Sequence, residues 1–173
     1  WDRRLKTTSF LEKFVSGGTE LAVMVARRAS GEIVAYDPVE MVVDPMLNLL
    51  DYLVAPARVS DALKLSAQEL AKRTVESFGT NGLFGVELFV TDHGDLLVNE
   101  VAPRAHNSGH HTIEACTTSQ FQNQLRACLD LPLGSTELRG IALTANLIGA
   151  PGFAGSPVIE GLDELLQIPD VHL

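Results

Sequence analysis

Residues Phe84–Val101 read FGVELFVTDHGDLLVNEV, and this stretch predicts a β-hairpin. Two apolar runs, Phe84–Thr91 and Asp95–Val101, flank an Asp-His-Gly turn, which is a typical signal of a tight connection between antiparallel strands. Side chains alternate between the two faces of a strand. Glu87 and Glu100 therefore both lie within the strands, and their relative placement decides what this sheet can bind.

The register of the hairpin controls whether these two carboxylates meet. A loop centred between His93 and Gly94 places Glu87 directly opposite Glu100. Facing carboxylates repel unless a cation lies between them, and Mg²⁺ bridging the phosphates of a nucleotide is the natural occupant. A bulge at Gly94 would shift the register by one residue. Alternatively, the glutamates lie on a solvated face with basic neighbours. Asn99 is a further oxygen ligand, but strict alternation places it on the opposite face.

A polar stretch, NEVAPRAHNSGHHTIEA at Asn99–Ala115, follows the second strand. Arg104 presents a planar guanidinium that suits a carboxylate, bicarbonate or phosphate. His106 and Asn107 are hydrogen-bonding groups close to it in sequence. Ser108-Gly109 allows close approach of the backbone to a ligand and opens a helical turn, whose N–H groups favour anions. Cation ligands beside anion donors suggest phosphoryl chemistry.

The three histidines of this stretch allow two other interpretations. His106, His110 and His111 could ligate zinc, but their spacing is irregular, no thiolate is nearby, and Arg104 would repel the metal. His110 and His111 could instead pack beside the hairpin, and for His111 packing is the preferred interpretation.

The sequence before the hairpin predicts strands followed by a helix. Strands are expected at Phe10–Val15, Leu21–Arg27, Ile33–Tyr36, Val39–Val43 and Leu49–Val54. Ser66 and Glu69 match a capping box at the start of a helix that ends at Gly79. These features predict a mainly antiparallel sheet with a flanking helix.

The sequence after the polar stretch predicts a helix, a strand and then a boundary. Phe121, Leu125, Cys128 and Leu129 recur at helical spacing, and Ile141–Ile148 reads as a strand. Residues 150–157 are rich in Gly and Pro, which predicts a domain of residues 1–149 and a linker with the start of a small domain at 150–173. A short helix is expected at Leu162–Gln167 and the beginning of a strand at Val171–Leu173.

Composition limits the class of protein. With 173 residues, of which 46% are apolar, the chain can bury a core and is not expected to be disordered. A net charge of -9 argues against nucleic acid or an anionic membrane as the main partner, and no apolar run is long enough to span a membrane. Cys116 and Cys128 lack metal-ligand spacing and are expected to be buried thiols in a reducing compartment, which favours the cytoplasm.

The motif NE-x-APR-x-HNSGH, followed by TSQFQNQLRACLDLPLG, resembles the 5-(carboxyamino)imidazole ribonucleotide synthase family, the ATPase subunit of phosphoribosylaminoimidazole carboxylase in purine biosynthesis. Upstream, LEKFV, ELAVMVAR, APARVS and GLFGVELFV also resemble that family. The resemblance implies an α+β fold: the C-terminal half of an ATP-grasp domain, mainly an antiparallel sheet with flanking helices, followed by the start of a small C-terminal β-rich domain.

The resemblance also implies a reaction, in which ATP and bicarbonate give carboxyphosphate and its carbon is delivered to the amine of 5-aminoimidazole ribonucleotide. By the family pattern, adenine is bound by Glu12, Lys13, Phe14 and Val15, and the ribose by Glu20. Magnesium is held by Glu87 and Glu100, with Asn99 at the phosphates. Arg104, His106 and Asn107 surround bicarbonate or carboxyphosphate. The full-length enzyme of the family is expected to be a homodimer.

The chain departs from the family pattern in three places. Val42-Val43 stands where many members have a histidine near the nucleotide. Three parts are expected to lie outside these residues: the N-terminal domain, the first part of the ATP-grasp domain with its phosphate-covering Gly-rich loop and lysines, and the C-terminal Tyr-Gly-Lys segment. We therefore expect the chain alone to have little or no turnover. A formate-dependent glycinamide ribonucleotide transformylase is the second candidate, although that enzyme has Asp-Thr-Gly at Asn107-Ser108-Gly109. A non-catalytic binding or assembly role is the third.

Overall fold

The computed structural model of the chain describes residues 12–15, 18–44, 49–149, 152, 154–156 and 158–173. The strands are β1 (Thr19–Arg27), β2 (Ile33–Ala35), β3 (Val39–Asp44), β4 (Leu49–Ala55), β5 (Gly82–Val90), β6 (Leu96–Ala102) and β7 (Ala142–Ala145). The helices are α1 (Asp61–Ser77), the 3-10 turn η1 (Asn107–Gly109), α2 (Thr112–Ala115), α3 (Gln120–Cys128) and α4 (Leu162–Leu165). The expected mixture of strands and helices is therefore confirmed.

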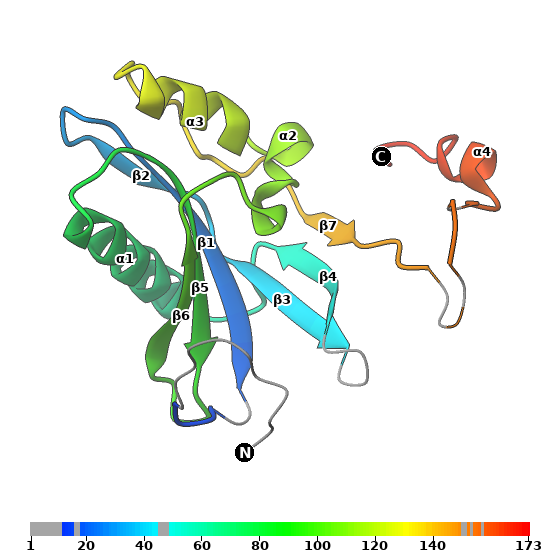
Figure 1. Cartoon of the computed structure of the whole chain (residues 1–173), viewed down its shortest axis with the longest axis horizontal. Helices are drawn as coiled ribbons and strands as arrows, with labels where there is room; N and C mark the ends of the chain where they lie inside the picture. Colours follow the sequence, from blue (N-terminus) through cyan, green and yellow to red (C-terminus); the bar gives the residue numbers. More distant parts are fainter. Residues whose placement is uncertain (1–11, 16–17, 45–48, 150–151, 153, 157) are drawn as a thin grey trace.

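All seven strands belong to one sheet in which every pairing is antiparallel. Their order is β6-β5-β1-β3-β4-β7, and β2 pairs with the end of β1 that β3 leaves free. β6 is thus an edge strand, and its whole length pairs with β5 (Figure 1). The predicted hairpin forms one end of the sheet.

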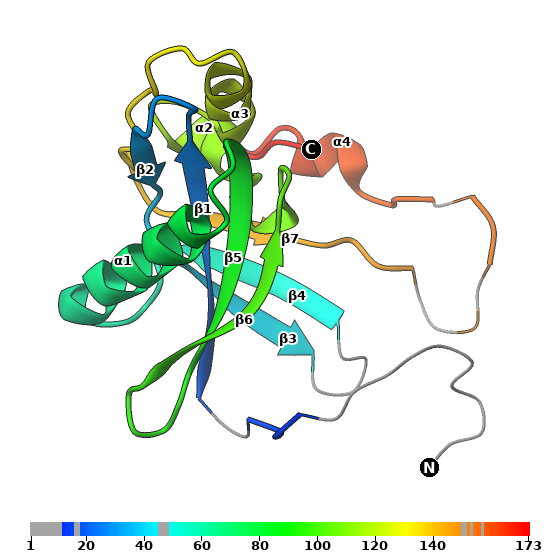
Figure 2. The same cartoon turned by 60° about the vertical axis from the view of Figure 1, so that its left-hand side comes forward.

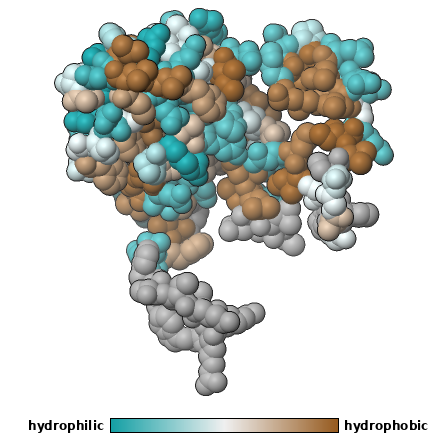
Figure 3. Space-filling view, turned by 45° about the horizontal axis from the view of Figure 1, so that its top comes forward, coloured by the Kyte–Doolittle hydropathy of each residue, from teal (hydrophilic) through white to brown (hydrophobic). Residues whose placement is uncertain are grey.

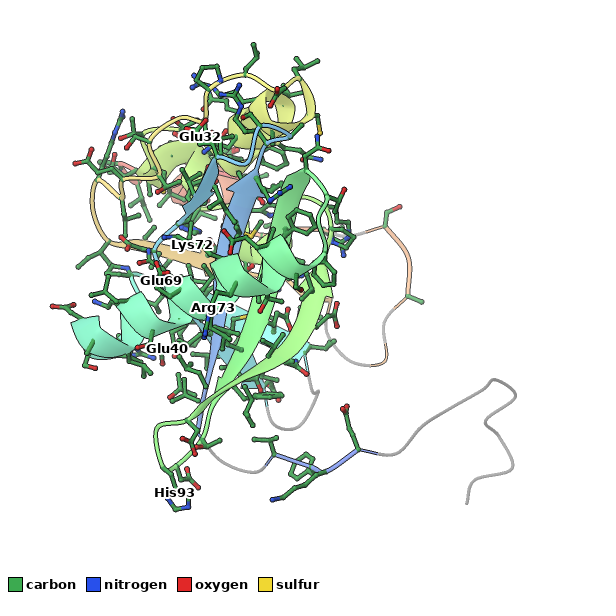
Figure 4. The ribbon with its side chains drawn as sticks, turned by 90° about the vertical axis from the view of Figure 1, so that its left-hand side faces the viewer. Glu32, Glu40, Glu69, Lys72, Arg73 and His93 are labelled. Atoms are coloured by element: carbon green, nitrogen blue, oxygen red, sulfur yellow. The ribbon has the colours of Figure 1, made fainter. Side chains whose placement is uncertain are left out.

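Helix α1 covers one face of the sheet because β1 and β5 alternate apolar residues toward it. Leu21, Val23 and Val25 of β1 are fully buried against Ala67 and the rest of the α1 face. Burying each such aliphatic side chain contributes about 1.5–3 kcal/mol. The outer side of α1 is polar: Figure 4 shows Glu69, Lys72 and Arg73 on it, and His93 far away at the tip of the hairpin.

The opposite face of the sheet is covered only in part. At the end near β2, Met24, Tyr36, Leu83 and Cys116 form a second buried cluster beneath α2 and α3. Figure 2 shows these helices gathered at that end of the sheet, while β5 and β6 continue beyond them. Polar side chains of this face can therefore lie on the uncovered part of the sheet.

Helix α1 begins earlier than the sequence predicts. The N-cap is Ser60, whose Oγ accepts a hydrogen bond from the backbone N–H of Leu63 at 3.3 Å. Ser66 lies inside the helix, and its Oγ donates to the carbonyl of Ala62 at 2.9 Å. The capping box predicted at Ser66 is wrong because the serine hydroxyl is used within the second turn. The end at Gly79 is confirmed, since the helix ends at Ser77 with Phe78 as its C-cap.

Helix α3 exposes the residues that its apolar spacing picked out. Leu125 and Leu129 are more than three-fifths exposed, and Cys128 is exposed as well. The buried face carries Gln120, Asn123 and Ala127, because the two side-chain amides bond to distant parts of the chain. The expectation that Cys128 is a buried thiol is therefore wrong, whereas Cys116 is buried as expected.

Two predicted strands are not found where the structure describes the chain. Residues 12–15 carry no strand assignment, and positions 10 and 11 lie outside the described residues. Val171–Leu173 is also irregular. The described part of the segment after residue 149 contains α4 but no strand, and Figure 3 shows brown apolar surface on it. Among the described residues, no helix is long and apolar enough to cross a membrane.

Candidate functional site

The hairpin places Glu87 directly opposite Glu100, as the sequence predicts, but the strand register that produces this pairing differs from the predicted one. Near the turn, Leu88 pairs with Val98, and the register shifts by one before Glu87 pairs with Glu100. The extra residue of this bulge is Asn99. The predicted pairing is confirmed, and the bulge that produces it lies inside β6, five residues beyond Gly94.

The bulge also corrects the expected direction of Asn99. The Asn99 side chain is close enough to the Glu87 carboxylate to lower its pKa, so both side chains lie on the same face of the sheet. Strict alternation predicts the opposite face, but a bulge interrupts alternation by placing two residues across from one. Glu87, Asn99 and Glu100 consequently form one oxygen-rich cluster.

Electrostatics in this cluster oppose the ionised form of Glu87. Burial raises the pKa of the Glu87 carboxyl above its ordinary value, and the carboxylates of Glu100 and Glu20 raise this pKa further, while the Asn99 hydrogen bond lowers it. Burial also raises the pKa of Glu20. Glu20 is close enough to act on Glu87 because Ala22, two residues along β1, is the direct partner of Glu87. A bound cation would reverse this repulsion.

His106 lies against β5 beside Glu87. Its Nε2 is 3.6 Å from Oε1 of Glu87, and both side chains are less than one-fifth exposed. The ring packs over Gly85, where a Cβ would come within 2.8 Å of His106 Cβ. Burial lowers the pKa of His106, and the charge of Arg104 lowers it further, so the imidazole is neutral at pH 7. Its contact with Glu87 is therefore not an ion pair.

The remaining residues of the polar stretch divide into exposed and buried groups. Arg104 is exposed, and its Nη1 donates to the carbonyl of Ala105 at 2.9 Å. His110 is exposed and stacks on Phe121. His111 is buried, as predicted, and burial lowers its pKa to about 4.

Asn107 connects the site to β4, which lies toward the opposite edge of the sheet from β6. Its Nδ2 donates to Oδ1 of Asn146 at 3.3 Å, and Asn146 in turn donates to the carbonyl of Leu50 in β4 at 3.0 Å. Asn146 was not predicted from the sequence. The available signal was one amide inside the run at 141–148, whose other residues are apolar except Thr144.

Gln120 and Gly85 are two further residues of the site that were not predicted from the sequence. The Gln120 side chain is fully buried and bonds to the backbone of His106, and Gly85 makes room for the His106 ring. A buried glutamine at the start of a largely polar helix leaves no periodic apolar pattern. A glycine within the apolar strand at 82–90 was the visible sign of close approach.

The residues expected to bind adenine lie in the segment before β1, and the residue expected to bind the ribose lies near the start of β1. Glu12, Lys13 and Phe14 are exposed, with Phe14 at 84%, and Val15 is half-buried. Glu20 lines a pocket of about 310 Å³ whose other walls come from residues 18–19 and from β3. Val42 and Val43, where the family pattern has a histidine, line the same pocket.

The oxygen cluster fits a magnesium ion held partly by a substrate. The described residues contain no group of three or more His, Cys, Asp or Glu side chains that could hold a metal by themselves. Magnesium usually binds one or two carboxylates together with water and substrate phosphates, rather than a cage made only of protein. Two facing carboxylates and an amide meet that requirement, whereas a zinc site with closed protein ligation would not be satisfied.

The sequence matches the ATP-grasp domain over residues 2–121, which is more than half of the chain. The chain therefore belongs to the ATP-grasp family. It is 45% identical to the phosphoribosylaminoimidazole carboxylase of Saccharomyces cerevisiae over 80% of this chain and 24% of that protein. It is 42% identical to the N5-carboxyaminoimidazole ribonucleotide synthase of Bacillus subtilis over 82% of this chain and 37% of that protein.

Solved structures show the same relationship. The N5-carboxyaminoimidazole ribonucleotide synthetase of Thermotoga maritima is similar with a TM-score of 0.82 and 50% identity, over 90% of this chain and 41% of that one. The N5-carboxyaminoimidazole synthase of Aspergillus clavatus, solved in complex with ADP and 5-aminoimidazole ribonucleotide, is similar with a TM-score of 0.75 and 42% identity over 80% and 37%. The chain spans 22–37% of the length of the curated relatives it matches.

Proposed function

We propose that this chain forms the magnesium- and phosphate-binding part of an ATP-dependent ligase that carboxylates 5-aminoimidazole ribonucleotide. The observation that carries the proposal is the pair Glu87–Glu100, which faces across β5 and β6 with Asn99 bulged onto the same face. The similarity to N5-carboxyaminoimidazole ribonucleotide synthases supports this choice of reaction. Because the chain spans about two-fifths of those proteins at most, we expect it to bind nucleotide but not to turn over alone.

The proposed reaction has two steps. A bicarbonate oxygen attacks the γ-phosphorus of ATP, and the bond from that phosphorus to the bridging oxygen breaks, which releases ADP and forms carboxyphosphate. The amine of the ribonucleotide then attacks the carbon of carboxyphosphate, expels phosphate and loses a proton, which leaves a new C–N bond. Each step needs orientation and neutralisation of negative charge more than covalent help from the protein.

The residues of this chain supply that orientation. Glu87 and Glu100 hold magnesium, which neutralises the phosphate charge when bound. Asn99 contacts the phosphates, and Arg104, His106 and Asn107 position the small anion. A neutral His106 suits this role because it offers an N–H to an anion and adds no positive charge that would compete with the cation for Glu87.

Binding of the nucleoside is assigned to the neighbouring end of β1. Glu20, which lines the pocket against β3, binds the ribose hydroxyls, and Glu12, Lys13, Phe14 and Val15 bind adenine. The exposure of Phe14 is consistent with a segment that a nucleotide covers on binding.

Calorimetric titration of the chain with ATP, with and without Mg²⁺, tests the proposal. We expect binding that depends on Mg²⁺ and that is lost in the double variant Glu87→Gln, Glu100→Gln. Glu76→Gln is the matched control, because Glu76 is exposed on α1 on the other face of the sheet. Unchanged Mg-ATP affinity in the double variant contradicts the metal assignment.

The alternative functions are separated by a second assay. In the complete enzyme, ATP hydrolysis is measured with bicarbonate and 5-aminoimidazole ribonucleotide, and separately with formate and glycinamide ribonucleotide. Dependence on the first pair is expected, and strict dependence on formate would identify the transformylase reaction instead. A chain that binds no nucleotide at all would favour a role in assembly.

The complete enzyme is proposed to be a cytoplasmic homodimer, as the family resemblance implies. Sedimentation equilibrium of the complete enzyme checks the assembly, and a monomer at micromolar concentration contradicts it.

A further inference from the structure

The backbone N–H and C=O of His106 are both hydrogen-bonded to one side chain. Oε1 of Gln120 accepts from the backbone N–H of His106 at 3.0 Å, and Nε2 of Gln120 donates to the backbone carbonyl of His106 at 2.9 Å. Gln120 is fully buried, so both hydrogen bonds are protected from water. A side chain with an acceptor and a donor on one planar group can bond both the N–H and the C=O of one residue in this way.

Gln120 is itself fixed at the start of α3. Its backbone N–H donates to Oγ1 of Thr112 at 2.8 Å, and that hydroxyl donates to the carbonyl of Gly109 at 2.6 Å. Ser119 caps the helix immediately before it through a capping box. Gly109 has no Cβ, and one there would come within 2.5 Å of the Gln120 amide oxygen. The glutamine therefore has little freedom, and this rigidity is passed on to His106.

The surroundings of the imidazole define which nitrogen carries the proton. Nδ1 of His106 lies 3.4 Å from the backbone nitrogen of Ser108, a group that can only donate. Nε2 lies 3.6 Å from the Glu87 carboxylate, a group that can only accept when ionised. Both neighbours favour a lone pair on Nδ1 and a proton on Nε2. The Ser108 hydroxyl, 2.8 Å from Nδ1, can donate to the same lone pair.

We propose that Gln120 is a positioning residue, which holds the His106 peptide so that the imidazole keeps its proton on Nε2 and directs it toward the edge of the oxygen cluster at Glu87. This inference rests on the proposed function, in which that edge is where the terminal phosphate meets the small anion. His106 then acts as an N–H donor to an anionic oxygen, and not as a metal ligand or a general base. Gln120 does not touch substrate; it acts through His106.

Nuclear magnetic resonance of the chain labelled with ¹⁵N-histidine tests this inference without nucleotide or metal. Two-bond ¹H–¹⁵N correlations report the tautomer of each of the five histidines, and loss of signals in His106→Gln assigns His106. Above the pH at which His106 is protonated, we expect an unprotonated Nδ1 and a protonated Nε2. In Gln120→Met, which keeps the volume but neither hydrogen bond, both nitrogen signals should move toward the average of the two tautomers.

Asn123→Leu is the matched control. Asn123 is equally buried on the same helix, but it bonds to Tyr36 Oη at 2.8 Å and to the backbone of Gly134, away from the site. Its loss destabilises the fold and should leave the His106 signals unchanged. A protonated Nδ1 in the wild type, or equal changes in Gln120→Met and Asn123→Leu, overturns the inference.

A second variant keeps the test decisive if Gln120→Met does not fold. Gln120→Glu has the same shape, and while its carboxyl is protonated it can still accept from the His106 N–H and donate to the carbonyl. Above the pH at which His106 is protonated, the ionised carboxyl of this variant cannot donate to the His106 carbonyl, so both nitrogen signals should move toward the average of the two tautomers. A tautomer that does not respond overturns the inference. Absence of Mg-ATP binding, by contrast, contradicts only the proposed function, because the tautomer is measured without ligand.

Discussion

Glu87 shows most directly how one residue links stability to the proposed chemistry. Burial and two nearby carboxylates raise its pKa above the ordinary value of 4.5, so folding favours the protonated form. Its contribution to stability is present below the unfolded-state pKa and is lost as the pH rises through the folded-state pKa. We therefore predict that the free energy of unfolding of Glu87→Gln rises relative to that of the wild type, by up to about 1 kcal/mol, as the pH increases above the ordinary carboxyl pKa of 4.5. Urea unfolding across this range measures the difference.

Other carboxyls have lowered pKa values and stabilise the fold as the pH rises, but their contributions cancel when wild type and Glu87→Gln are compared. Hydrogen bonds from Arg58 lower the pKa of Glu40, and those from Arg28 lower the pKa of Asp130, so both groups add stability as the pH rises. They are present in both proteins and drop out of the difference. A stability difference that is constant with pH contradicts the role assigned to Glu87.

Gly85 is predicted to be required for the position of His106. A Cβ at residue 85 would lie 2.8 Å from Cβ and 2.9 Å from Cγ of His106, so the imidazole must move away from β5. We expect Gly85→Ala to cost about 1–3 kcal/mol, as overpacking does, and to shift the His106 resonances. Gly140→Ala is the control, because no atom lies within 4 Å of the Cβ it would introduce. Unchanged His106 resonances in Gly85→Ala would contradict the packing described.

At the scale of elements, α1 begins at a different residue from the one that the local sequence motif predicts. Ser66-Ala-Gln-Glu69 matches a capping box, yet the cap is Ser60, six residues earlier. We predict that Ser60→Ala costs about 1 kcal/mol, since it leaves the N–H of Leu63 without its side-chain acceptor. Ser66→Ala should be close to neutral, because alanine is the better residue inside a helix. Urea unfolding of both variants checks this, and the reverse order contradicts it.

The sequence predicts elements well where a pattern is local and poorly where burial is arranged from a distance. Alternation and the turn residues predict β5 and β6, and with them the meeting of Glu87 and Glu100. The buried face of α3 is not predictable in this way, because Asn123 is satisfied by Tyr36, which is 87 residues away in sequence. Apolar periodicity cannot distinguish a buried amide with such partners from an exposed one.

The bulge at Asn99 is intermediate between these cases. Its consequence, the pairing of Glu87 with Glu100, follows from a simple count across the turn, but its position does not. The count gives the correct pair because two offsets cancel. Next to the turn, the observed pairing differs by one residue from the pairing assumed in the count, and the extra residue Asn99 removes that difference before Glu87. The direction of Asn99 depends on the bulge itself, so alternation alone assigns it to the wrong face.

At the scale of the whole molecule, the antiparallel sheet with α1 on one face is the part that the sequence and the family pattern both predict. The boundary expected at 150–157 implies that the segment after it contributes little to the stability of the sheet domain. From residue 158 onward no described residue is buried, and an ion pair to the sheet domain, from His172 Nδ1 to Glu114 Oε1, spans 3.7 Å. Such an exposed pair contributes little. β7, by contrast, pairs with β4 over four residues.

We therefore predict different outcomes for two truncations. Ending the chain after residue 157 should change the free energy of unfolding by no more than about 0.5 kcal/mol, as for changes at exposed positions. Ending it after residue 140 removes β7 and, with it, the hydrogen bonds of Asn146 to Asn107 and Leu50, so a clear loss of stability is expected. Urea unfolding with matched far-ultraviolet circular dichroism measures both. A large loss on removing 158–173 alone would mean that this segment belongs to the same cooperative unit as the sheet, and that the boundary lies elsewhere.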